Sequence, residues 1–123
     1  MTRKTVWLAG GWLLVALVVY LSLAPQPPEV LPFAASDKFK HCLAYATLSL
    51  WFCQIYVRVR QRAVVVAVLI ALGIALEFVQ GWSGYRTFEI ADMVADSIGA
   101  MLGLLLVHTP LGRSLVWFEN IFR

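Results

Sequence analysis

The sequence predicts an all-α, multi-pass membrane protein with four transmembrane helices and a short C-terminal interfacial helix. Composition is the first observation behind this prediction: of the 123 residues, 61% are hydrophobic and 14% are charged, whereas soluble domains are about 45–50% apolar and about 25% charged. The second is a series of apolar runs of about twenty residues, the length that crosses ~30 Å of hydrocarbon. We therefore expect one membrane domain over residues 1–123, and exclude an ordinary soluble enzyme and a disordered chain.

The first predicted span covers residues 5–24, which include no charged residue. A cleaved signal peptide is the alternative, because Arg3 and Lys4 precede the run and small residues end it. A retained span is favoured, because the run exceeds a usual signal-peptide core and Pro25 would directly follow the cleavage point. Prolines then end the helix, since proline lacks an N–H donor, and the segment to Ala35 should be an extended loop.

The second predicted span covers residues 37–57. Ser36 is a suitable N-cap, and Asp37 places a negative charge in the first turn, where the helix dipole favours it. The next loop is expected to hold three arginines: Arg58, Arg60 and Arg62.

The third predicted span covers residues 63–80 and ends in a tight turn at Gly81–Gly84. A fourth span is expected at residues 88–107. After it, Thr109 and Pro110 have the residue types of an N-cap and a first helical position. The remaining segment places apolar residues at i, i+4, i+7 and i+11, which predicts an interfacial helix with one apolar stripe: Leu111, Leu115, Phe118 and Phe122.

The basic residues predict the orientation. Seven of the ten would lie at one membrane surface and three at the other, and the positive-inside rule places both termini in the cytoplasm. The seven are Arg3, Lys4, Arg58, Arg60, Arg62, Arg113 and Arg123, and the three are Lys38, Lys40 and Arg86.

Polar residues gather in the outer halves of three predicted spans, where a charged side chain is costly unless it is paired or hydrated. Within each group they are three or four residues apart and share a helix face, so the groups can converge on one outward-facing pocket. The catalytic candidates are His41, Glu77 and Asp92. The candidate ligand-binding residues are Asp37, Lys38, Tyr45, Gln80, Arg86 and Asp96.

Simpler structural roles compete for several of these positions. Gly99 and Gly103 form a G-x-x-x-G pattern, which predicts close helix packing. Arg86 and Asp92 can form an ion pair that only neutralises their charges, and His41 can be an ordinary helix-end residue. The gathering of so many ionisable groups at one depth favours a functional site. No cysteine and histidine spacing indicates zinc, and no metal, cofactor or nucleic-acid partner is predicted.

In this order, the motifs resemble the VanZ-like family of small bacterial integral membrane proteins. The matching elements extend over nearly the whole chain. Position 96 departs from the family pattern, which usually has Asn there, and so adds a negative charge. The resemblance implies a place in the cell envelope, in the cytoplasmic (inner) membrane of a bacterium, and a link to glycopeptide (teicoplanin) resistance, but it supplies no reaction. The elements are Asp37-Lys38-x-x-His41-x-x-x-Tyr45, Glu77-x-x-Gln80, Arg86 and Asp92-x-x-x-Asp96-x-x-Gly99-x-x-x-Gly103.

Three functions remain open on these observations. The first is a binder that captures an envelope lipid, a lipid-linked precursor or a glycopeptide without changing it. The second is a membrane-embedded enzyme acting on a lipid headgroup or lipid-linked saccharide, with His41 or Glu77 as general acid or base and Asp92 and Asp96 orienting the substrate or holding a divalent cation. Ion- or proton-linked transport is third, because the inner half offers few polar residues.

Overall fold

The structure is a computed structural model that describes residues 3–23, 37–83 and 90–121. Within these ranges all regular structure is helical, which confirms the all-α prediction. The side chains of Arg3, Asp37, Lys38 and Ser83 lie outside the description. The helices are α1 (Arg3–Leu23), α2 (Asp37–Ile55), α3 (Val59–Ser83), α4 (Ile90–Leu106), the 3-10 turn η1 (Pro110–Arg113) and α5 (Ser114–Ile121).

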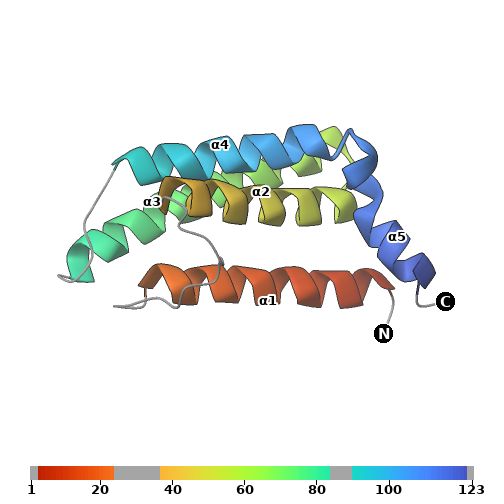
Figure 1. Cartoon of the computed structure of the whole chain (residues 1–123), viewed down its shortest axis with the longest axis horizontal. Helices are drawn as coiled ribbons and strands as arrows, with labels where there is room; N and C mark the ends of the chain where they lie inside the picture. Colours follow the sequence, from red (N-terminus) through yellow and green to blue (C-terminus); the bar gives the residue numbers. More distant parts are fainter. Residues whose placement is uncertain (1–2, 24–36, 84–89, 122–123) are drawn as a thin grey trace.

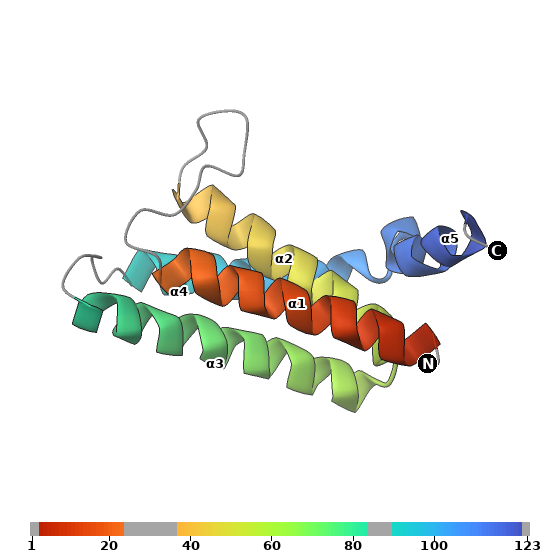
Figure 2. The same ribbon diagram turned by 90° about the horizontal axis from the view of Figure 1, so that it is seen from below.

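Helices α1 to α4 lie lengthwise in a bundle, and α5 crosses the end of the bundle where α1 begins (Figure 1). Helix α2 contacts α1, α3 and α4, and is therefore the central helix. Seen from below, α1 and α3 lie beside each other on one face of the bundle, with α2 behind them (Figure 2). The α2–α4 pairs that touch run in the same order along both helices, so these two helices are parallel.

Within the described residues, two helices are long and apolar enough to cross a membrane by themselves. They are α1, over Lys4–Leu23, and α3, over Val59–Trp82. A third crossing is obtained if α4 and the segment from Pro110 to Ile121, bent by 78°, count as one span. Helix α2 does not reach the same apolarity. Helix α2 packs against three other helices, and polar residues are tolerated in a membrane span where they face the interior of a bundle.

The buried core is assembled around α2. Tyr45, Leu48 and Phe52, at successive positions along one side of α2, pack against two residues of α3 and one of α4. Each is at most 7% exposed. The partners from α3 and α4 are Val66, Leu69 and Ala100.

Helix α3 is longer at both ends than the sequence predicted. It begins at Val59, so Arg60 and Arg62 belong to its first turn, and the predicted three-arginine loop was wrong. Arginine is a good helix former, and Arg62 Nε donates to the carbonyl oxygens of Cys53 (2.9 Å) and Tyr56 (3.2 Å), which closes the α2–α3 connection.

The sequence also predicted a tight turn at Gly81–Gly84, and this was wrong for residues 81–83, which are helical. Helix α3 continues to Ser83, because adding residues to an established helix is far easier than starting one, even at a glycine. Gly84 lies outside the described residues.

The C-terminal segment is attached to the bundle. Thr109 caps η1 by accepting a hydrogen bond from the Leu111 N–H, with Pro110 in the first turn, as the sequence predicted. The Gln54 side chain, near the end of α2, accepts from the Leu115 N–H (3.0 Å) and thereby holds the first turn of α5. Trp7 of α1 donates to Glu119 and packs edge-on against Phe118, so α5 contacts α1 as well as α2.

Candidate functional site

A group of buried polar side chains lies where α2, α3 and α4 meet. This region is the end of the bundle at which α2 and α4 begin and α3 finishes. Each of these residues is at most 8% exposed as a whole, in a bundle whose other buried residues are mostly apolar. They are Tyr45 from α2, Glu77 and Gln80 from α3, and Asp92 and Asp96 from α4.

His41 lies between two aspartates of α4. Its Nδ1 atom is 2.7 Å from Asp96 Oδ1, and its Nε2 atom is 3.9 Å from Asp92 Oδ2. Asp92 and Asp96 are one helical turn apart, so their carboxylates are stacked along α4 and each faces a different ring nitrogen. The side chains become less accessible in the order His41 (17%), Asp92 (11%) and Asp96 (3%). His41 and Asp92 therefore form the accessible side of the group, and Asp96 forms its base.

The Asp96 contact determines what His41 can do chemically. A neutral imidazole that donates from Nδ1 to Asp96 leaves Nε2 as a lone-pair acceptor, whereas a protonated ring donates from both nitrogens. The second carboxylate, Asp92, lies on the Nε2 side. The ring is thus fixed in orientation and has one nitrogen directed toward the accessible side of the site.

Tyr45 and Glu77 complete the cluster. Tyr45 is one turn after His41 on α2 and is 2% exposed, and Glu77 of α3 is 1% exposed. A charge on Glu77, like one on Asp96, would act on both His41 and Tyr45. The three helices therefore contribute to one electrostatically connected group rather than to separate polar positions.

Three glycines allow the helices to approach at this site. A Cβ atom on Gly99 would overlap the backbone of Cys42, and one on Gly103 would lie 2.5 Å from Ser49 Cβ and 2.6 Å from the Ala46 carbonyl oxygen. On the other side of α4, a Cβ atom on Gly73 would lie 2.6 Å from Asp96 Oδ2. Asp96 therefore occupies the space beside Gly73 at the α3–α4 contact.

Gln80, a predicted ligand-binding residue, makes a contact away from the cluster. Its Nε2 atom donates to the carbonyl oxygen of Ser22 at 2.7 Å, which ties the end of α3 to the end of α1. A backbone partner at this distance gives Gln80 a role in joining helices.

The predicted basic rim of the pocket falls mostly outside the description. Asp37 and Lys38 are the first two residues of α2, but their side chains are not described, and Arg86 lies outside the described residues. Lys40 is half-buried. Across residues 3–23, 37–83 and 90–121, no three His, Cys, Asp or Glu side chains are grouped so as to hold a metal ion.

Sequence reasoning missed Gly73 and the role of Ser49. The Ser49 hydroxyl donates to the Ala100 carbonyl oxygen at 2.7 Å and joins α2 to α4 below the histidine. Gly73 could have been found, because Gly73, Glu77 and Gln80 are spaced i, i+4 and i+7. They mark one face of small and polar residues on an otherwise apolar helix.

The chain matches a known family over most of its length. The family model described as VanZ/LLP1 matches residues 11–111. A fission yeast protein (Schizosaccharomyces pombe), "Uncharacterized protein C11E3.10", is 36% identical over 107 residues, which are 85% of this chain and 63% of that protein. The chain thus spans less than two thirds of this relative. A fungal relative means that the resemblance does not by itself assign the chain to a bacterium. No solved structure matches the chain.

Proposed function

The chain belongs to the VanZ/LLP1 family, and we propose that it is a membrane-embedded binding protein for an amphiphilic ligand of the cell envelope. The apolar helices are those of a membrane protein. The proposed topology has four crossings, α1 to α4, with both termini in the cytoplasm of a bacterium. Helix α2 is included because α1, α3 and α4 all pack against it, so its buried polar residues, among them Ser49, are covered by protein rather than by lipid.

The buried group of His41, Asp92 and Asp96 carries this proposal. Ionisable side chains at membrane depth are rare and usually functional. In this group the exposed fraction of the side chain falls from His41 through Asp92 to Asp96. In the proposed orientation it lies toward the outer leaflet, where the headgroup of an envelope lipid or lipid-linked precursor, or a glycopeptide, would reach it. Hydroxyl or amine groups of such a ligand would hydrogen-bond to His41 and Asp92, and Lys38, Lys40 and Arg86 would hold its phosphate or carboxylate.

One observation also supports an enzyme. The Asp96–His41 contact holds the imidazole by Nδ1 and directs Nε2 toward the accessible side, which is how a histidine acting as general acid or base is oriented. On this alternative, Asp96 positions the ring, and His41 Nε2 exchanges a proton with a bound lipid headgroup or lipid-linked saccharide.

Mass spectrometry of the intact protein, purified in mild detergent with its co-purifying lipids, tests the binding proposal. His41→Gln and Asp92→Asn should lose a retained ligand that the parent keeps. Thr47→Val is the control, because Thr47 is exposed on the same helix and its hydroxyl donates within that helix, to the Leu43 carbonyl oxygen. Equal retention by all four proteins would contradict the proposed site. Conversion of the ligand by the parent, but not by His41→Gln, would instead establish the enzyme.

The topology has its own test. Trp82 and Gln61 are exposed near opposite ends of α3. In a variant without Cys42 and Cys53, a cysteine at position 82 should react with a membrane-impermeant reagent added outside, and a cysteine at position 61 should not. The reverse pattern would overturn the orientation and move the site to the inner leaflet.

A further inference from the structure

An apolar groove lies between α1 and α3, away from the carboxylate cluster. Its volume is about 540 Å³, within the range of small-molecule sites, about 300–1,000 Å³. Trp12 and Val15 of α1 form one wall and α3 forms the other, from Val64 to Leu72. Phe52 and Tyr56 of α2 form the floor.

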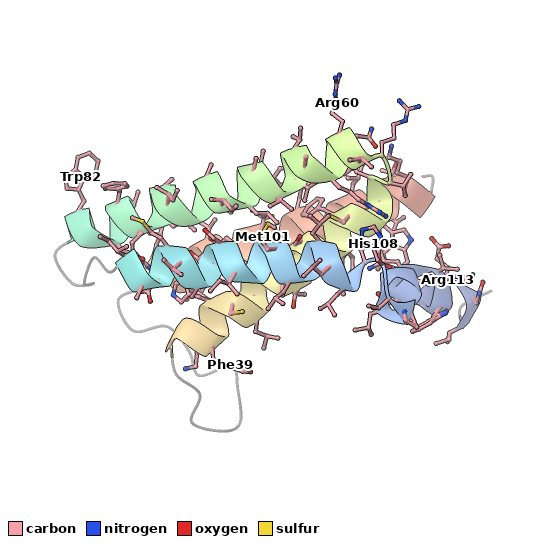
Figure 3. All side chains as sticks on the ribbon, turned by 90° about the horizontal axis from the view of Figure 1, so that it is seen from above. Phe39, Arg60, Trp82, Met101, His108 and Arg113 are labelled. Atoms are coloured by element: carbon pink, nitrogen blue, oxygen red, sulfur yellow. The ribbon has the colours of Figure 1, made fainter. Side chains whose placement is uncertain are left out.

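The groove is apolar along its length and basic at one end. Arg60 and Gln61 of the first turn of α3 lie at that end. Figure 3 shows Arg60 extending outward there, at the end of the bundle that also carries Arg113, whereas Trp82 marks the opposite end. Lys4 Nζ is 5.4 Å from the centre of the Tyr56 ring, so a second cation stands over the floor at the same end.

We propose that this groove is a specific site for one acyl chain of an anionic phospholipid, with its phosphate held by Arg60 and Lys4. Arg60 and Leu72 are twelve positions apart on α3, which is about 18 Å at 1.5 Å per residue. Half of the ~30 Å hydrocarbon core is about 15 Å, so the groove is as long as one leaflet is thick. A chain that filled it would place its phosphate at the two cations.

The charges select among lipids. Arg60 and Lys4 can both contact a phosphate diester that carries no compensating ammonium group. A zwitterionic headgroup would bring its own cation to the same place. Arg62 donates to the carbonyl oxygens of Cys53 and Tyr56 and is not assigned to the phosphate. The proposal requires that the chain lies in a membrane, but it does not depend on a ligand at His41 or on orientation.

Binding is tested by mass spectrometry of the intact protein with added phosphatidylglycerol or phosphatidylcholine of identical chains. The parent should prefer phosphatidylglycerol. Arg60→Gln should weaken that preference about fivefold, the factor equivalent to about 1 kcal/mol for one basic residue at an anionic surface. Arg113→Gln, the control, removes an exposed arginine from the same end of the bundle. Equal loss in both variants, or no preference in the parent, would overturn the proposal.

Filling the groove tests the chain-binding part. Val68 is 56% exposed and lines the groove, and Val94 is 51% exposed on α4 outside it. Val68→Trp should reduce binding of both lipids, and Val94→Trp should not. Unchanged binding in Val68→Trp would overturn the proposal. A dimer in the parent that Val68→Trp abolishes would make the groove a contact between two copies and would overturn it too.

Photo-crosslinking gives a readout that does not depend on a variant folding. A phosphatidylglycerol with a photoreactive acyl chain should label Val64, Val68 and Leu72 more strongly than Val94 and Ile98, which face outward on α4. Equal labelling of the α3 and α4 positions would mean that the groove contacts lipid only as any exposed helix face does, and would overturn the proposal. If neither face is labelled, the membrane location itself fails, so the two proposals can be told apart.

Discussion

The α2–α4 contact and the α1–α3 face differ in how their helices meet. Between α2 and α4, Gly99 and Gly103 bring the backbones so close that a single added carbon would overlap α2. Between α1 and α3, large side chains such as Trp12 hold the helices apart and leave a groove. The buried carboxylates lie with the first contact and the open apolar volume with the second. In this bundle, close backbone approach encloses polar groups, and bulky side chains create space for apolar ones.

Preventing the close approach of α2 and α4 should have the largest effect on the free energy of unfolding. Gly103→Leu would force side-chain atoms into Ser49 and the backbone of α2, and overpacking against a backbone that cannot move should destabilise the protein by about 3 kcal/mol or more. Unfolding by SDS titration in mixed micelles measures the free energy. Ala91→Leu, at an exposed position of the same helix, is the control. Equal stability of both variants would show that Gly103 is not a contact point.

Removing the carboxylate that holds His41 should have the next largest effect. Asp96→Ala loses a charge-assisted hydrogen bond at a site that is 3% exposed, which should cost about 2 kcal/mol. Asp96→Asn keeps an acceptor for Nδ1 and should cost less. A double-mutant cycle with His41→Ala should give a coupling energy of about 1 kcal/mol or more, because the two residues share one bond. Simple additivity of the two changes would argue against a functional pair.

A matched pair of hydroxyls on α2 sharpens the comparison further. Ser49→Ala removes the hydrogen bond to the Ala100 carbonyl oxygen across the α2–α4 contact and should cost about 1 kcal/mol. Thr47→Val removes a bond within α2 at an exposed position and should cost less than about 0.5 kcal/mol. If the two variants lose the same stability in SDS titration, the Ser49 bond does not help to hold α2 against α4.

The smallest effect is expected on the open face. Val68→Leu adds one methylene group beside a groove that has room for it, so the free energy of unfolding should change by less than about 0.5 kcal/mol. A loss comparable with that of Gly103→Leu would mean that the α1–α3 face is as tightly packed as the α2–α4 contact.

The helical class and approximate helix positions were readable from the sequence, because apolar length and proline breaks are local properties. Helix ends were less readable. Residues 59–62 were assigned to a loop because of their charge, yet Arg62 reaches back to the end of α2 and is helical itself. Charge marks where a helix leaves hydrocarbon, and a helix can continue beyond that point.

The candidate site could also be predicted from the sequence only in part. Spacing placed His41 and Tyr45 on one helix face and Asp92 and Asp96 on another, and the structure brings these faces together. Spacing could not show that His41 binds Asp96 more closely than Asp92, nor that Gln80 turns to Ser22 of α1. Those outcomes depend on helix rotation, which the packing of Gly73 and Gly99 determines.

The polarity of α2 has a consequence for how the protein is made. A segment is released into lipid by the insertion machinery according to its own hydrophobicity, and charged residues count strongly against it. In the proposed four-span topology, α2 does not meet this requirement, whereas α3, which follows it after a connection of three residues, is strongly apolar. We therefore expect α2 to stay in the insertion machinery until α3 has been made, and then to enter the lipid together with α3 as a helical hairpin. The polar face that carries His41 is then covered first by protein rather than by lipid.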